Sequence, residues 1–149
     1  MNQDFKDLLE AFINEKVRFL IVGGFAVIKH SEPRYTKDLD LWVSPDLENA
    51  QRVYRALSDF GAPVSGLTPA DFTKEGYFFT MGFDPGRIDI LLDAKELNFE
   101  DCWKRRVSAQ LGELEINYVS RDDLIRNKEA VARLQDLADA EKLRQTKDE

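Results

Sequence analysis

Apolar residues recur at helical spacing near the start of the chain and again in its middle. Residues 2–16 repeat them at i, i+3, i+4, i+7 and i+8, which predicts an amphipathic helix capped by Asn2. A second helix is expected to begin at Ser44-Pro45, where a capping residue precedes a proline, and to stop at Gly61. Shorter helical segments are predicted at 25–30, after Thr68-Pro69, and at 98–106 with Asn98 as the cap.

The C-terminal part of the chain has the pattern of one long helix. Ser120 and Asp123 resemble a capping box in which aspartate replaces the usual glutamate. From there the sequence predicts helix as far as about Leu143. The apolar positions of this helix are Leu124, Ile125, Ala132, Leu134, Leu137 and Ala138.

Strand patterns lie between the predicted helices. A continuous apolar run at 18–22 predicts a buried strand, and residues 38–43 alternate apolar and polar side chains. Residues 77–83 and 87–93 flank the tetrapeptide DPGR, whose proline and glycine positions suit a type II turn, so an antiparallel hairpin is expected. A further strand is predicted at 114–119.

The order of these elements indicates an α/β or α+β domain with a helical C-terminal part. A chain of 149 residues fits one domain. We therefore expect a single domain over residues 1–149, with a core at about 1–95 and a mostly helical part at about 96–149.

Composition narrows the functional classes. The chain is 43% hydrophobic and 33% charged, and it has no apolar run of the ~20 residues that span a bilayer. Its acidic, amphipathic N-terminus is unlike a secretory signal, so we expect a cytoplasmic protein without a membrane partner. The net charge of −7 argues against broad nucleic-acid binding but leaves room for a local basic groove.

Cysteine and histidine each occur once. A single cysteine excludes an internal disulfide, and the two residues together are too few for a Cys/His zinc site. We interpret Cys102 as a small packed residue rather than a reactive thiol, because buried cysteine is common. His30 is interpreted as structural.

Three carboxylates occupy strand-like segments. Asp38 and Asp40 are two residues apart, so they are expected on one strand face about 6.6 Å apart. Asp89 stands between two isoleucines on the returning strand of the hairpin. If the two strands are neighbours, the carboxylates repel one another unless a hard cation such as Mg²⁺ joins them. Asp38, Asp40 and Asp89 are therefore predicted to hold one or two Mg²⁺ ions.

Residues that suit phosphate binding precede the acids. Gly23-Gly24 end the first strand, where glycine lets a ligand approach the backbone and the N–H groups of a helix start attract phosphate. Arg34 suits bidentate phosphate contact, and Thr36 adds a hydroxyl. Each residue alone has an ordinary structural explanation. Their combination in this order favours a triphosphate site.

The stretch LIVGGFAVIKHSEPRYTKDLDLWV resembles the signature of the nucleotidyltransferase superfamily that includes DNA polymerase beta. Gly23-Gly24 match its glycine pair, Asp38-Leu39-Asp40 match its acidic motif, and RIDIL matches the strand carrying the third carboxylate, Asp89. The arrangement is most similar to small bacterial minimal nucleotidyltransferases related to abortive-infection toxins. Charged positions of the tail also match this group, namely Lys128, Arg133, Asp136 and Asp139.

The resemblance implies a nucleotidyltransferase fold, a small mixed sheet packed by helices, and transfer of a nucleoside monophosphate from a nucleoside triphosphate to an acceptor. Asp38 and Asp40 would hold metal, and Asp89 would complete the site and take the acceptor's proton. Backbone at the glycine pair would contact the triphosphate. Arg34, Thr36 and Lys128 would steady the phosphates or the base.

Three functions remain open at this stage. The first is an active nucleotidyltransferase, including one that acts within a toxin–antitoxin pair. The second is a non-catalytic module on the same fold, a partner or regulator of another protein. The third is a metal-dependent phosphoesterase. The sequence leaves a tRNA, a protein or a small molecule open as acceptor, and a partner protein or a homodimer open as the assembly.

Overall fold

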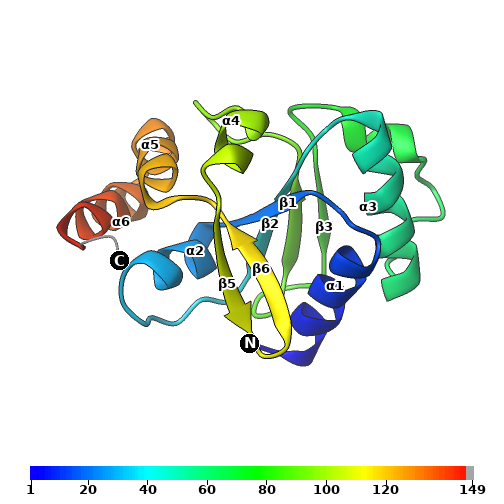
Figure 1. Cartoon of the computed structure of the whole chain (residues 1–149), viewed down its shortest axis with the longest axis horizontal. Coiled ribbons are helices and arrows are strands. Elements are labelled where there is room, and N and C mark those ends of the chain that lie inside the picture. The colour runs from blue at the N-terminus through cyan, green and yellow to red at the C-terminus, as the bar shows by residue number, and fades with distance from the viewer. Residues whose placement is uncertain (147–149) are drawn as a thin grey trace.

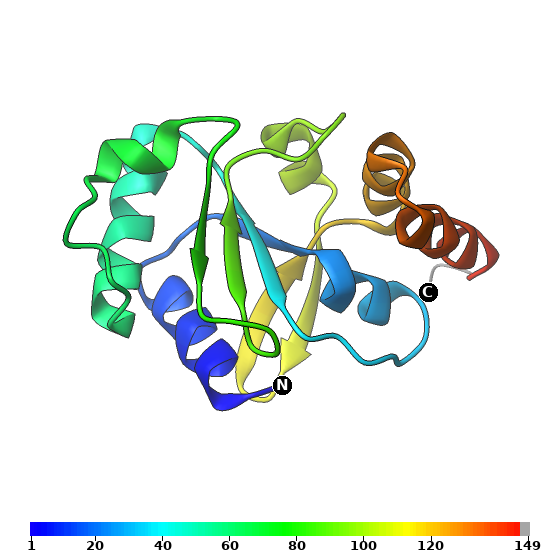
Figure 2. The same cartoon turned by 180° about the vertical axis from the view of Figure 1, so that it is seen from behind.

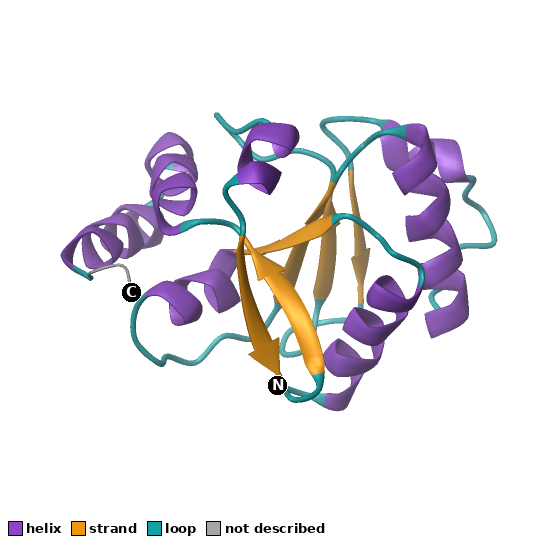
Figure 3. Cartoon of the chain, viewed as in Figure 1, coloured by secondary structure: helices purple, strands orange, loops and turns teal. Residues whose placement is uncertain are grey.

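The computed structural model describes residues 1–146, and residues 147–149 of the expected helical part lie outside them. Its helices are α1 (Gln3–Asn14), α2 (Gly23–His30), α3 (Leu47–Phe60), the 3-10 helix η1 (Pro69–Thr73), α4 (Phe99–Lys104), α5 (Arg121–Val131) and α6 (Leu134–Gln145). Its strands are β1 (Phe19–Val22), β2 (Leu39–Val43), β3 (Phe78–Met81), β4 (Ile88–Leu91), β5 (Val107–Leu111) and β6 (Leu114–Tyr118) (Figures 1 and 3).

The strands form one mixed sheet in the order β3-β4-β2-β1-β6-β5. The pairs β2–β4 and β1–β6 are parallel, and the other neighbours are antiparallel. The expected mixed sheet packed by helices is therefore confirmed, and so is the β3–β4 hairpin. Parallel neighbours need long connections, and here helices supply part of each crossover.

Helices cover the sheet from two sides. α1 and α3 pack together on the right of Figure 1, while α2, α5 and α6 gather on the left, and Figure 2 shows the same division from behind. All four residues of β1 are buried, as expected of a central strand. On β2, Leu39, Leu41 and Val43 are fully buried, and Trp42 packs edge-on against Phe99 of α4 with ring centroids 5.2 Å apart.

Capping side chains set several helix ends as the sequence predicts. Asn2, Asn98 and Ser120 each accept a hydrogen bond from the backbone N–H three residues later. Gly61 ends α3 in the left-handed conformation at φ +96°. The predicted cap of α3 is wrong, because Asp46 rather than Ser44 accepts the hydrogen bond from the Asn49 N–H.

Three further expectations are corrected. DPGR forms no hydrogen-bonded tight turn, and the Gly86 N–H instead donates to the Lys37 carbonyl at 2.8 Å. β5 was not predicted; its alternating half-buried and exposed residues pair with β6. The tail helix divides into α5 and α6 at Ala132, which has a φ of +62°. Its expected apolar face is confirmed on α5, where Leu124 is buried and Ile125 packs against the core, and is wrong from Ala132 on, where Leu134 is 90% exposed.

The single cysteine and the single histidine have structural surroundings. Cys102 is fully buried, and burial raises the pKa of its thiol to about 11, which fits a packed residue. His30 Nε2 donates to the Val119 carbonyl at 2.8 Å and so links α2 to the end of β6. Among residues 1–146, no helix combines the length and apolarity needed to cross a membrane.

The α5–α6 junction yields a stability prediction. Ala132 occupies the left-handed region, where a Cβ costs about 1 kcal/mol and glycine carries no such penalty. Ala132→Gly should therefore raise the free energy of unfolding by about 0.5–1 kcal/mol and the Tm by about 2–4 °C. Ala138→Gly, inside α6, should lower both, because glycine weakens a helix interior. Thermal unfolding followed by circular dichroism measures the Tm of both variants. Tm shifts of the same sign in the two variants would contradict the explanation.

Candidate active site

Strand register brings the predicted acids together. β2 and β4 run parallel with Asp40 directly opposite Asp89, and Val22 lies opposite Asp40 on the other side. Asp38 lies one residue before β2 rather than inside it, because pairing begins where the Leu39 N–H donates to the Arg87 carbonyl at 2.9 Å. The three carboxylates therefore gather where β2 and β4 begin.

Burial and proximity oppose ionisation of these acids. Burial, followed by the neighbouring Asp89 carboxylate, raises the pKa of Asp40 to about 7. Burial, followed by a hydrogen bond with Asp84, also raises the pKa of Asp38. Asp89 is 9% exposed and accepts a hydrogen bond from the Thr80 hydroxyl at 2.8 Å. The cluster therefore favours a nearby cation, which would let Asp38 and Asp40 ionise.

Arg87 is the cation that the sequence analysis missed. Its guanidinium lies 3.2 Å from Asp38, 3.2 Å from Asp89 and 3.5 Å from Asp84. These carboxylates, Asp89 first, raise the pKa of Arg87. The sequence did contain a signal, since Arg87 and Asp89 are two residues apart on a strand and so project to one face.

The donor set suits Mg²⁺, although Arg87 lies among the acids. Within residues 1–146, no three acidic, histidine or cysteine side chains are already drawn together as a metal cluster. Asp38 Oδ1 is nevertheless buried without a hydrogen-bond partner, which leaves an acceptor available. Carboxylate oxygens are the ligands that Mg²⁺ prefers. Asp38, Asp40 and Asp89 therefore fit the predicted metal site.

Glycine is required at the end of β1 because side chains fill the space beside it. Gly23 has a φ of +68°, and a Cβ there would lie 2.2 Å from Asp40 Oδ2. At Gly24, a Cβ would lie 2.4 Å from Thr36 Oγ1. Both glycines belong to the first turn of α2, which begins two residues earlier than predicted. The start of this helix thus lies against the acidic cluster.

The C-terminal helices join the site through a buried ion network. Lys128 lies 3.3 Å from Asp136 and 3.2 Å from Asp139, and both carboxylates are 2% exposed. Asp139 also contacts Arg34 at 2.5 Å, and Arg133 contacts Asp136 at 2.6 Å. Burial acts to raise the pKa of Asp139, but hydrogen bonds from Gln135 and Lys128 outweigh it and the pKa is lowered. These acids are therefore ionised partners of the basic residues.

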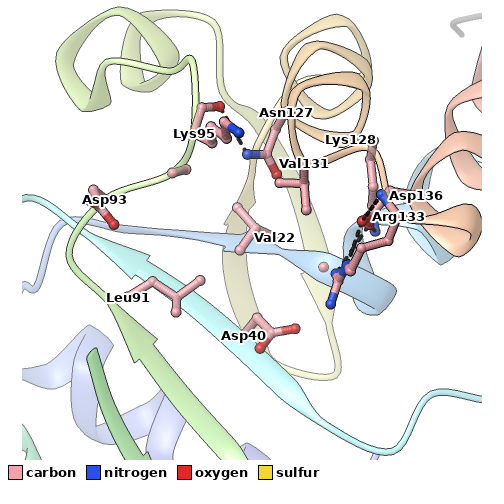
Figure 4. Close-up of a pocket in the computed structure, with 12 residues that line it drawn as sticks. Val22, Asp40, Leu91, Asp93, Lys95, Asn127, Lys128, Val131, Arg133 and Asp136 are labelled. Carbon is pink, nitrogen blue, oxygen red and sulfur yellow. Dashed lines mark hydrogen bonds and ion pairs between the residues drawn. The ribbon is translucent and has the colours of Figure 1, made fainter. Parts of the chain in front are cut away.

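A cleft with two lobes surrounds Asp40. The glycine lobe, about 270 Å³, includes Gly24, Arg34, Thr36 and Asp38. The Asp93 lobe, about 260 Å³, includes Leu91, Asp93, Asn127 and Val131. Both lobes share Gly23, Asp40, Lys128, Arg133 and Asp136. Figure 4 shows Asp40 on one wall of this cleft and the side chains of α5 and Arg133 on the other.

All the predicted site residues except Asp89 line the glycine lobe. Asp89 is outside this lining and lies next to Asp40 on the neighbouring strand. Arg34 and Lys128, expected at the phosphates, are held by Asp139. The Thr36 hydroxyl donates a long hydrogen bond to the Asp38 carbonyl, with 3.5 Å between the two oxygens. The arrangement combines acids for a metal, a helix start for phosphate and basic groups on the opposite wall.

The raised pKa of Asp40 predicts how stability depends on pH. A carboxyl whose folded pKa exceeds its unfolded value keeps its proton in the folded state, so its contribution to stability is complete below about pH 4 and is lost as pH rises through about 7. Asp40→Asn should therefore raise the Tm above wild type at pH 8 by several degrees and have little effect at pH 4. Thermal melts without divalent cations measure this. A constant difference across pH would contradict it.

Comparison with known proteins supports the same fold. No protein-family profile matches the sequence, and no curated protein matches it. The lincosamide antibiotic adenylyltransferase LnuA, solved with lincomycin bound, superposes with a TM-score of 0.59 at 15% identity over 97% of each chain. A Thermotoga maritima protein assigned as a nucleotidyltransferase superposes with a TM-score of 0.59 at 19% identity, over 94% of this chain and 88% of the other. The chain therefore has the nucleotidyltransferase fold that its glycine and aspartate motif resembles.

Proposed function

We propose that this protein is a Mg²⁺-dependent nucleotidyltransferase, which moves a nucleoside monophosphate from a nucleoside triphosphate to an acceptor hydroxyl. The observation that carries the proposal is the register of β2 and β4, which sets Asp40 opposite Asp89. Asp38 and Asp40 face a cleft that also contains the start of α2 and basic side chains, and Asp89 lies beside Asp40. Nucleotidyltransferase neighbours of the same fold support the general class.

Each group of residues has a role that follows from its position. Asp38, Asp40 and Asp89 would hold one or two Mg²⁺ ions, which when bound neutralise phosphate charge and favour pyrophosphate as the leaving group. The backbone of Gly23 and Gly24 would receive the triphosphate at the start of α2. Asp89 would accept the proton of the attacking hydroxyl.

The basic wall would orient the nucleotide. Lys128 and Arg133 line both lobes of the cleft. Arg34 lines the glycine lobe, and its guanidinium is fixed by Asp139 at 2.5 Å. A fixed guanidinium is suited to a phosphate oxygen, since less side-chain freedom is lost on binding. These residues would therefore contact phosphate without leaving their buried acidic partners.

A small molecule is the acceptor that the cleft favours. The two lobes, about 270 and 260 Å³, together fall within the range of small-ligand sites, roughly 300–1,000 Å³. The net charge of −7 disfavours a long nucleic acid. LnuA, which shares the fold along the chain, is an adenylyltransferase of an antibiotic, again a small molecule. We assign the triphosphate to the glycine lobe and the acceptor to the Asp93 lobe.

Carboxylate substitutions test the nucleotide site. Asp38→Asn, Asp40→Asn and Asp89→Asn should each weaken Mg²⁺-dependent triphosphate binding by at least about tenfold, because each removes a metal ligand. Calorimetric titration of the four common triphosphates, with and without Mg²⁺, measures this. Asp59→Asn, a substitution of an exposed acid outside the cleft, is the matched control.

The wild-type titration separates the enzyme from the non-catalytic alternative. Binding of a triphosphate only with Mg²⁺, followed by release of pyrophosphate with a suitable acceptor, is the expected behaviour. If wild type binds no triphosphate, the fold serves as a partner module. If water alone is the acceptor, the protein is a phosphoesterase. A toxin–antitoxin role and the cytoplasmic location stay predictions from the sequence.

Arg87 yields a separate prediction about the metal. Its guanidinium lies among the carboxylates that would hold Mg²⁺, so the two cations compete. Arg87→Ala should tighten Mg²⁺ binding several-fold in calorimetry without nucleotide. Arg55→Ala, which removes an exposed arginine paired with Glu15, should leave the affinity unchanged. Weaker Mg²⁺ binding by Arg87→Ala would show that Arg87 supports the metal instead.

A further inference from the structure

The edge strand β3 is unusually apolar and exposed. β3 ends the sheet, and within residues 1–146 it pairs only with β4. The segment 76–83, GYFFTMGF, contains no charged residue. Tyr77, Phe78 and Phe83 are 64%, 67% and 88% exposed. Edge strands are usually protected by charge, proline or a covering segment, because an open edge is a template for another strand.

The opposite edge strand, β5, is also uncharged, but the side chains that it exposes are polar. β5 exposes Ser108 and Gln110, and the basic run 104–106 precedes it. The two edges of the sheet therefore differ in their exposed side chains, since β3 exposes the aromatic ring of Phe78 where β5 exposes Ser108 and Gln110.

An apolar groove lies beside the start of β3. Its volume is about 160 Å³, and its apolar lining residues are Leu67, Phe72, Phe78, Phe79 and Leu92, with Asp71 also in the wall. Lys74 and Tyr77 also line it, at the end where the strand begins. A hydrophobic side chain brought to this end of the strand would find apolar walls within reach.

We infer that β3 pairs antiparallel with β3 of a second copy of this chain, making a symmetric dimer with a continuous sheet across the interface. Two-fold symmetry makes such an interface self-complementary, since each copy presents the same patch. Antiparallel pairing sets the end of each strand beside the start of the other. Phe83, which follows the strand, then enters the groove at the start of β3 in the other copy.

Charge favours a second copy as the occupant. Each copy carries a net charge of −7, so a self-interface must exclude like charges, and the uncharged segment 76–83 does so. Lys74 and Glu75 precede the strand, and Asp84 follows it. The antiparallel approach places both Lys74 and Glu75 of each copy near Asp84 of the other, so Lys74 offsets the like charges of the two acids. Within each chain Lys74 also pairs with Asp71 and Asp84 with Arg87, so the ends of the segment stay close to charge balance.

The interface lies next to the cleft. Thr80 of β3 donates a hydrogen bond to Asp89, and Phe78 pairs in register with Leu91, which lines the Asp93 lobe. A dimer through β3 therefore brings the second copy beside the acceptor side of the site. The inference itself rests on the strand edge and is independent of the proposed function.

Sedimentation velocity of the full 149-residue chain tests the dimer, at concentrations up to about 100 μM. Wild type should sediment as a dimer. Phe78→Lys should weaken the dimer at least about tenfold by placing charge on the strand, and Phe83→Lys should do so by removing the side chain that fills the groove. Both residues are largely exposed, so the fold should survive, as circular dichroism would show.

Leu134→Lys is the matched control. Leu134 is 90% exposed on α6, away from β3, so this substitution should leave the dimer unchanged. A wild type that stays monomeric throughout the concentration range would overturn the inference and leave the edge to a different protein. A dimer that survives both phenylalanine substitutions, or that Leu134→Lys dissociates, would also overturn it.

Discussion

The mutual repulsion of carboxylates at the start of β2 and β4 is the constraint on which the site depends. Parallel pairing sets Asp40 opposite Asp89, and burial adds to the cost of ionising Asp40. A cation placed among these carboxylates would reduce their mutual repulsion. Arg87 supplies a positive charge from the protein itself, and the available oxygen of Asp38 indicates where a metal ligand remains. The fold thus holds carboxylates close together, and a bound metal with its nucleotide would reduce their repulsion.

The C-terminal helices complete the site by balancing charge on its other wall. Lys128 and Arg34 share the buried carboxylate of Asp139, and Arg133 pairs with Asp136. These contacts link α5 and α6 to the segment that precedes β2. Removing one partner of a buried ion pair leaves the charge of the other uncompensated. The network is therefore suited to fix the position of α5 and α6 against the segment that precedes β2. The basic wall therefore combines α5 and α6 with Arg34, from the segment that also carries Asp38.

Much of the fold was predictable because its signals are local. Helix periodicity, the caps at Asn2 and Asn98 and the left-handed glycine at Gly61 depend on residues within one or two turns. The break at Ala132 was not predictable in the same way. Alanine has the highest helix propensity, and its positive φ coincides with packing of α6 against α5 and with the Asp136 carboxylate that accepts the Arg133 N–H. β5 was missed because its alternation is weak and pairing with β6 completes it.

Sequence pattern alone was enough to find the motif residues of the candidate site: an acidic pair at strand spacing, a third acid on a later strand and a glycine pair before a helix. Those features are set by residue type and by the two-residue period of a strand. Tertiary structure decided which side chains meet. Strand order put Asp40 beside Asp89 and brought Arg87 among the acids, and helix docking set Asp139 against Arg34. Asp40 and Asp89 are 49 positions apart in the sequence, and Arg34 and Asp139 are 105 positions apart. Such contacts depend on the packing of the whole chain, which the local sequence pattern does not encode.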